Sequence, residues 1–112
     1  MNKSRFVMTL ALATVAGTTL ALPPFVGDFQ KTYKVPAGSA LAKANCATCH
    51  IGMTPKLNPY GQDLKKAMAT LKTKKLTADV LKKIEKLDSD KDGVKNGVEI
   101  KKGTLPGDPK SK

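Results

Sequence analysis

The sequence predicts a small all-α domain with three main helices. Its 112 residues allow one domain and no more. Apolar residues recur at spacings of three and four, and nowhere alternate with period two over a useful length. Hydrophobic residues make up 40% of the chain and aromatic residues 4%, so the protein's own core is thin. We therefore expect a disulfide, a metal or a cofactor to support the fold.

The first 21 residues are expected to be a signal peptide rather than part of this domain. Lys3 and Arg5 precede the apolar run Phe6–Leu22, and a Thr-Leu-Ala sequence ends at Ala21 as a cleavage site. The alternative is a membrane anchor, but the run is short for a span and interrupted by threonines. Cleavage leaves residues 22–112 with a formal charge of +9, exported to the periplasm or beyond.

The mature chain opens with the segment Leu22–Ala37, which holds three prolines and three aromatic residues. We expect it to form an irregular or extended arm whose rings cover a cofactor. Ser39 is a suitable N-cap for a first helix that reaches about His50 and stops at Gly52 or Pro55.

Two further helices are expected after this region. Asn58 followed by Pro59 pairs an N-cap with proline at the first helical position, and the helix runs to about Lys72. Thr77 caps the third main helix. The apolar stripes of the two helices are Leu64, Ala67, Met68 and Leu71, and Val80, Leu81, Ile84 and Leu87.

Both cysteines and the only histidine lie together in the sequence Cys46-Ala47-Thr48-Cys49-His50. C-x-x-C-H is the attachment signature of c-type haem. Positions i, i+3 and i+4 share one face of a helix. Cys46 and Cys49 can therefore bond to the two vinyl groups of one porphyrin edge, while His50 binds the iron as the proximal ligand.

Three other uses of these residues fit less well. A disulfide between Cys46 and Cys49 would close a short, strained loop. A thioredoxin-like redox pair needs a βαβ context, which the flanking sequence does not provide. A zinc site needs four ligands, and the chain has no further cysteine or histidine.

Residues 88–99 fit the calcium-loop pattern D-x-D-x-D-G-x5-E without a mismatch. Gly93 permits the sharp turn, and Val98–Lys102 is expected to be a short exit helix ended by Gly103. Four of the nine acidic residues occupy ligand positions in this lysine-rich chain, which argues against an accidental acidic turn. The expected Ca²⁺ ligands are the side chains of Asp88, Asp90, Asp92, Asn96 (direct or through water) and Glu99, and the carbonyl of Val94.

With these motifs the chain resembles small monohaem c-type cytochromes, broadly of class I. The stretch from Pro55 to Gly61 is similar to a P-x-L-N-x-aromatic-G stretch of some bacterial cytochrome domains. The resemblance implies helices wrapped round one covalent haem, and backbone near Pro55 accepting the ring N–H of His50. The calcium loop is similar to the solitary EF-hand-like loops of thrombospondin type 3 and dockerin units, because Lys95 replaces an apolar residue of paired EF-hands.

The sixth iron ligand is open to several interpretations. No second histidine exists, so bis-His ligation within one chain is excluded. Met68 lies 18 residues beyond His50, far enough to fold over the opposite haem face, and is the best candidate for the distal ligand. It fits equally well as a core residue of its helix. A lysine ligand or an open distal site are the other options.

These features together predict a monomeric, periplasmic electron-transfer protein rather than an enzyme. Its lysines favour an acidic redox partner through electrostatic steering. Nucleic acid and stable membrane insertion after signal cleavage are not expected. Two alternatives stay open: a haem sensor or peroxidase-like enzyme with an open distal site, and a calcium-binding haem subunit of a larger complex.

Overall fold

The computed structural model describes residues 24–111. The signal peptide expected over residues 1–21 lies outside them. The elements are α1 (Pro24–Tyr33), α2 (Ala40–Ala44), the 3₁₀ helix η1 (Asn45–Thr48), α3 (Pro59–Thr70), α4 (Ala78–Ile84) and α5 (Asn96–Lys102). The all-α fold class is confirmed, since residues 24–111 contain no strand and only one isolated bridge, between His50 and Leu57.

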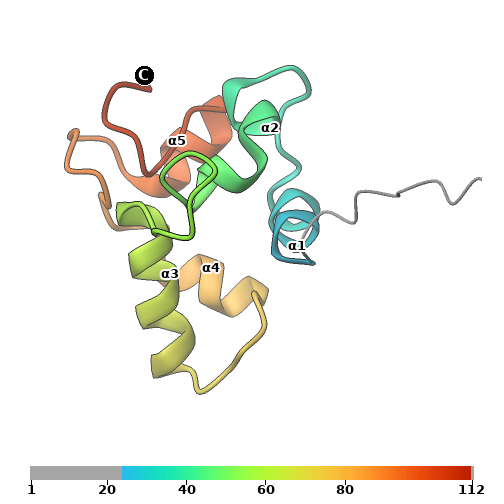
Figure 1. Ribbon diagram of the computed structural model, residues 1–112, viewed down its shortest axis with the longest axis vertical. Coiled ribbons are helices and arrows are strands. Elements are labelled where there is room, and N and C mark those ends of the chain that lie inside the picture. The colour runs from blue at the N-terminus through green and yellow to red at the C-terminus, as the bar shows by residue number, and fades with distance from the viewer. Residues whose placement is uncertain (1–23, 112) are drawn as a thin grey trace, which may run out of the picture.

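The helices form two groups (Figure 1). α3 and α4 pack against each other in the lower half of the view, whereas α2 and α5 lie above them and α1 lies to their right. The core between the groups is small and apolar, in agreement with the composition. It consists of Phe29, Leu41, Tyr60, Leu64, Ala67, Leu76, Val80, Leu81, Ile84 and Ile100.

The expected extended arm at residues 22–37 is wrong, because residues 24–33 form α1. Pro24 opens the helix, where its missing N–H interrupts no intrahelical bond. Phe29 and Tyr33 are one turn apart, and their ring centroids lie 5.1 Å from each other. Phe29 also meets Tyr60 edge-on at 6.2 Å, so packing against α3 holds α1 in place.

The first predicted helix is shorter than expected. Ser39 caps α2 as predicted, and its Oγ accepts the N–H of Ala42 at 3.1 Å. At Asn45 the backbone takes a positive φ of +48°, which ends α2, and the chain continues as η1. The expected regular helix up to His50 is thus replaced by a tighter turn.

The remaining helix boundaries follow the predicted caps closely. Asn58 and Thr77 accept backbone N–H groups at the starts of α3 and α4. α5 starts at Asn96, two residues before the expected exit helix, and Gly103 ends it in the left-handed conformation. Leu71 and Leu87, the last members of the two predicted stripes, lie beyond the helix ends and are exposed. Within residues 24–111 no helix has the length and apolar character needed to cross a membrane.

Candidate functional site

Cys46, Cys49 and His50 line one cavity on the surface of α2 and η1. α1 forms another wall with its aromatic and aliphatic side chains, and the empty space, including the part open to solvent, is about 540 Å³. The remaining lining residues are Phe25, Val26, Phe29, Gln30, Leu41, Asn45 and Thr48.

The two cysteines are free thiols in the structure. Burial, and to a lesser degree the neighbouring Cys46, raises the pKa of Cys49 to about 11. A redox-active C-x-x-C pair relies on a thiol whose pKa is lowered, so that a thiolate forms at neutral pH. The environment of Cys49 does the opposite, which argues against the thioredoxin-like alternative.

The turn at His50 is set by backbone hydrogen bonds to Cys46. The carbonyl of Cys46 accepts the N–H of Cys49 at 3.2 Å and that of His50 at 2.9 Å. The Nδ1 atom of His50 is buried and has no hydrogen-bond partner. The expectation that backbone near Pro55 accepts this ring N–H is therefore wrong. The loop 51–56 is exposed and hydrogen-bonds to itself instead.

Asn58 ties the start of α3 to this cysteine-histidine turn, a role that the sequence indicated only as a helix cap. Its Nδ2 donates to the carbonyl of Ala47 at 3.1 Å and to that of Thr48 at 3.0 Å. Its backbone N–H donates to the carbonyl of Cys49 at 2.9 Å. Its Oδ1 accepts the N–H of Gly61 at 2.9 Å. This one buried residue thus fixes three consecutive residues of the motif, two through its side chain and one through its backbone.

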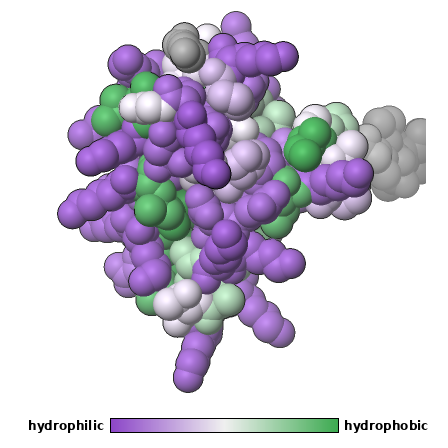
Figure 2. Space-filling view, turned by 90° about the vertical axis from the view of Figure 1, so that its left-hand side faces the viewer, coloured by the Kyte–Doolittle hydropathy of each residue, from purple (hydrophilic) through white to green (hydrophobic). Residues whose placement is uncertain are grey.

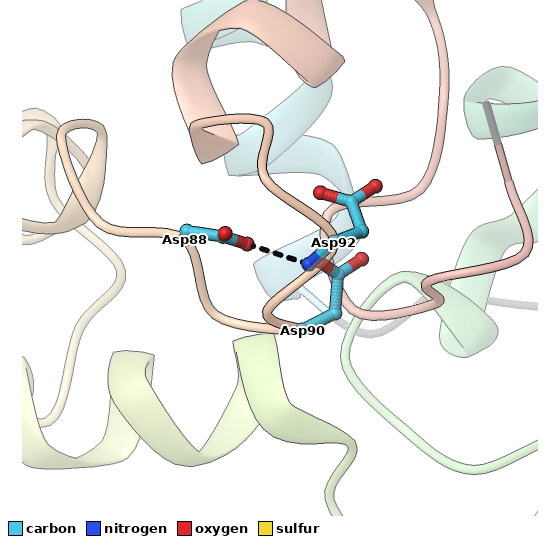
Figure 3. Close-up of side chains that lie close together, drawn as sticks. All are labelled: Asp88, Asp90 and Asp92. Carbon is cyan, nitrogen blue, oxygen red and sulfur yellow. Dashed lines mark hydrogen bonds between the residues drawn. The ribbon is translucent and has the colours of Figure 1, made fainter.

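The carboxylates of Asp88, Asp90 and Asp92 gather on one turn, with ligand oxygens within 4.8 Å of one another. Figure 3 shows the carboxylate of Asp88 reaching across the turn to the N–H of Asp92, which it accepts at 3.2 Å. The N–H of Gly93 donates to the other oxygen of Asp88 at 2.8 Å. Gly93 has φ +91°, which a side chain would strain.

Glu99 supplies a buried carboxylate to the same cluster. The residue is 1% exposed, and neither of its carboxylate oxygens has a hydrogen-bond partner. Burial, followed by repulsion from Asp90 and Asp92, raises the pKa of Glu99 to about 8. Burial likewise raises the pKa of Asp90 to about 6. Within residues 24–111 the only ion pair is Lys66–Asp63, so no side-chain cation lies within 4.0 Å of the carboxylates of this cluster.

Of the other two expected calcium ligands, Val94 lies beside the acidic cluster, whereas the side chain of Asn96 is bonded to other groups. Val94 borders a hollow together with Asp92 and Glu99, and its N–H donates to Asp92 at 2.8 Å. The amide of Asn96 is buried and engaged elsewhere: it accepts from the N–H of Ser89 and donates to the carbonyl of Ile84 and to Ser89 Oγ. The structure therefore uses Asn96 to join the loop to α4 rather than leaving its amide free for an ion.

A comparison with known families explains the first cavity. The family model for cytochrome c matches residues 35–104. The chain belongs to the cytochrome c family. The family carries covalent haem c and is one of haem-based electron transfer, and the motif from Cys46 to His50 fits its C-x-x-C-H signature. Neither a curated protein nor a solved structure matches the chain.

The residues of this cytochrome's cavity fit such a group. Two thiols and an imidazole lie on one wall, and the rings of Phe25 and Phe29 face the same space. The imidazole of His50 lies on the same wall as the two thiols, and a neutral imidazole is a common metal ligand. α1 lies before the matched region, so this part of the wall falls outside the residues that the family model matches.

Met68 lies away from this cavity. It is half-buried and packs against the hydrophobic core, and it is not among the cavity's lining residues. Met53, the other methionine of residues 24–111, is 92% exposed. The core role of Met68 is thus observed, and its role as the distal iron ligand stays a prediction.

Proposed function

We propose that this cytochrome is a periplasmic electron carrier with one haem c bound to Cys46 and Cys49. The observation that carries the proposal is the single cavity wall formed by the two thiols and His50. His50 would be the proximal ligand, and its backbone N–H, which donates to the carbonyl of Cys46, fixes the turn that carries the ring. When bound, the haem supplies an iron that takes up and releases one electron. No side chain of the cavity is needed as a catalytic group, so we infer no enzymatic activity.

The α1 wall has a physical role in this proposal. The rings of Phe25 and Phe29 would cover apolar porphyrin surface and exclude water from part of it. A drier, less polar surrounding disfavours the more highly charged oxidation state and so helps to set the reduction potential.

We further propose a structural Ca²⁺ site in the loop 88–99. Asp88, Asp90, Asp92 and Glu99 offer the oxygen ligands that a hard divalent cation takes, and the carbonyl of Val94 is a further candidate. The support is the buried Glu99 carboxylate, which lacks both a hydrogen bond and a countercharge. Asn96 would act, if at all, only through water, since its amide already makes three hydrogen bonds.

Export is part of the proposal through the signal peptide expected at residues 1–21. Its support is the basic start, apolar run and cleavage sequence. Attachment of haem c takes place outside the cytoplasm, so export and the C-x-x-C-H motif agree.

Intact mass of the protein purified from a periplasmic extract tests the proposal. We expect the mass of residues 22–112 plus one haem, with colour that acid–acetone does not extract. The Cys46→Ala/Cys49→Ala variant should lose the covalent haem, while the Met53→Leu variant, at an exposed position, should retain it. A wild-type mass without added haem would overturn the proposal.

One observation favours the second candidate, a haem whose distal side binds small ligands. Among residues 24–111 the cavity walls offer His50 as the only customary iron ligand, and Met68 lies elsewhere. Addition of CO to the reduced protein separates the two functions. A Met68-ligated carrier resists CO and becomes CO-reactive in the Met68→Leu variant. An open site binds CO in both proteins with the same spectrum.

A further inference from the structure

The segment after α5 contacts the haem-binding region at two separate points. The carbonyl of Gly103 accepts the N–H of Leu41 at 2.9 Å, which joins the segment to α2. Gly107 lies against Asn58, so closely that a Cβ there would be 2.5 Å from Asn58 Cγ. Leu105 and Gly107 also line a hollow together with Ala47, His50 and Asn58.

Asn58 transmits the second contact to the haem motif. Its amide holds the carbonyls of Ala47 and Thr48, and its backbone N–H holds that of Cys49. A displaced Asn58 would release three backbone carbonyls next to the iron-binding residue. Because Gly107 leaves no room for a side chain, the position of the C-terminal segment determines where the Asn58 amide can lie.

The same segment is anchored to the calcium loop. The carbonyl of Glu99 accepts two hydrogen bonds from Thr104, one from the backbone N–H at 2.9 Å and one from the side-chain hydroxyl at 3.2 Å. Glu99 also contributes the buried carboxylate of the acidic cluster. The side chain of Glu99 therefore faces the candidate cation, while its backbone carbonyl holds the C-terminal segment.

We propose that a divalent cation in the loop 88–99 positions the C-x-x-C-H motif, with Asn58 as the positioning residue that carries the effect. The inference rests on the proposed haem and calcium sites, and assigns a physical connection between them. The cation holds the carboxylate of Glu99, and the carbonyl of Glu99 holds Thr104. The segment 103–107 is thereby kept in contact with Leu41 and Asn58. Without the cation, no shared ligand holds the carboxyl groups of the loop together, and this chain of contacts loosens.

The test follows amide hydrogen exchange and Soret-region circular dichroism of the haem-loaded protein while Ca²⁺ is added after treatment with a chelator. In the wild type, Ca²⁺ should slow exchange at Leu41, His50 and Asn58 by about tenfold. It should also shift the Soret dichroism. The amide of Leu71, which donates to the carbonyl of Ala67 just beyond the far end of α3, serves as the internal reference and should not respond.

The Asn58→Asp variant separates the effect of the Gly107–Asn58 contact from that of the Gly103–Leu41 contact. Aspartate keeps the oxygen that caps α3 but loses the amide donor to Ala47 and Thr48. We expect Ca²⁺ to bind with unchanged affinity by calorimetry and still to slow exchange at Leu41. The amide of His50 and the Soret signal should no longer respond.

The Gly107→Ala variant gives an independent check, with Gly27→Ala as its matched control, because a Cβ at Gly27 meets nothing within 4 Å. Gly107→Ala should weaken the haem response to Ca²⁺, and Gly27→Ala should keep it. The proposal is overturned if Ca²⁺ does not bind, or binds without changing the haem signals, or changes them equally in Asn58→Asp. A protein without covalent haem, recognised by its mass, would instead refute the proposed function itself.

Discussion

At the scale of single residues, the site combines positions that the sequence identifies with others that it does not. Cys46, Cys49 and His50 were predictable because their spacing alone brings them to one side of a turn. Glu99 was predictable as a loop position, but its full burial depends on the surrounding elements. Asn58 was recognised as a cap, and only the fold gives its amide two further carbonyl partners.

Glu99 leads to a prediction about pH. Its pKa in the folded protein, raised from 4.5 to about 8, means that the folded state binds this proton more tightly than the unfolded chain does. Without calcium, stability should therefore fall as the pH rises from about 5 to about 8. Calcium binds the ionised carboxylate and should reverse this trend. Melting temperatures measured with and without a chelator across this range test both statements.

The Glu99→Gln variant provides the matched comparison. Removing the charge should raise the melting temperature of the calcium-free protein at pH 8 and flatten its pH dependence. Added calcium should then stabilise the variant much less than the wild type. Asp28→Asn, on the exposed surface of α1, is the control and should behave like the wild type. Equal responses of Glu99→Gln and wild type to pH and calcium would contradict the assignment.

At the scale of elements, the caps set most boundaries and packing sets the rest. Ser39, Asn58 and Thr77 each accept a backbone N–H at the position predicted from sequence. α1 was missed because proline and glycine are poor helix formers in general, although Pro24 stands at a position that tolerates it. The tilted contact of Phe29 with Tyr33 and its edge-on contact with Tyr60 then stabilise the helix.

The end of α5 carries the prediction for this scale. Gly103 has φ +80°, and a Cβ there would lie 2.5 Å from the Cβ of Ser39. Gly103→Ala should therefore destabilise the protein by about 1–3 kcal/mol through backbone strain and overlap. Gly27→Ala, within α1 and without close neighbours, should be neutral or stabilising by up to about 1 kcal/mol. Urea denaturation compares them, and equal stabilities would show that the Gly103 contact with α2 is unimportant.

At the scale of the whole molecule, lysine side chains dominate the surface. Figure 2 shows hydrophilic side chains projecting over most of the face seen there. The lysine side chains of α3, α4 and the adjoining segments are exposed, and they outnumber the acidic residues nearby. They are Lys65, Lys66, Lys72, Lys74, Lys75, Lys82, Lys83 and Lys86. Such a surface favours encounter with anionic partners.

Oxidation by small reagents of opposite charge tests this electrostatic effect. The rate with the anion ferricyanide should fall as ionic strength rises from about 0.01 to about 0.2 M, because the Debye length shrinks from about 30 Å to less than 10 Å. The rate with a cationic cobalt complex should rise over the same range. The Lys82→Glu/Lys83→Glu variant should show a weaker dependence of the ferricyanide rate on ionic strength. Rates independent of salt with both reagents would indicate that the lysines serve solubility alone.

The sequence by itself determined what depends on neighbours within one or two turns: the haem motif, the acidic loop, the helix caps and the absence of a sheet-forming pattern. The tertiary structure decided what depends on segments far apart in the chain. It places α1 on the cavity wall, the C-terminal segment on Asn58, and Met68 against the core rather than on that wall. Motifs and helix caps depend on residues that are close together in the sequence. The contacts just named form only when separate helices bury their apolar faces against one another.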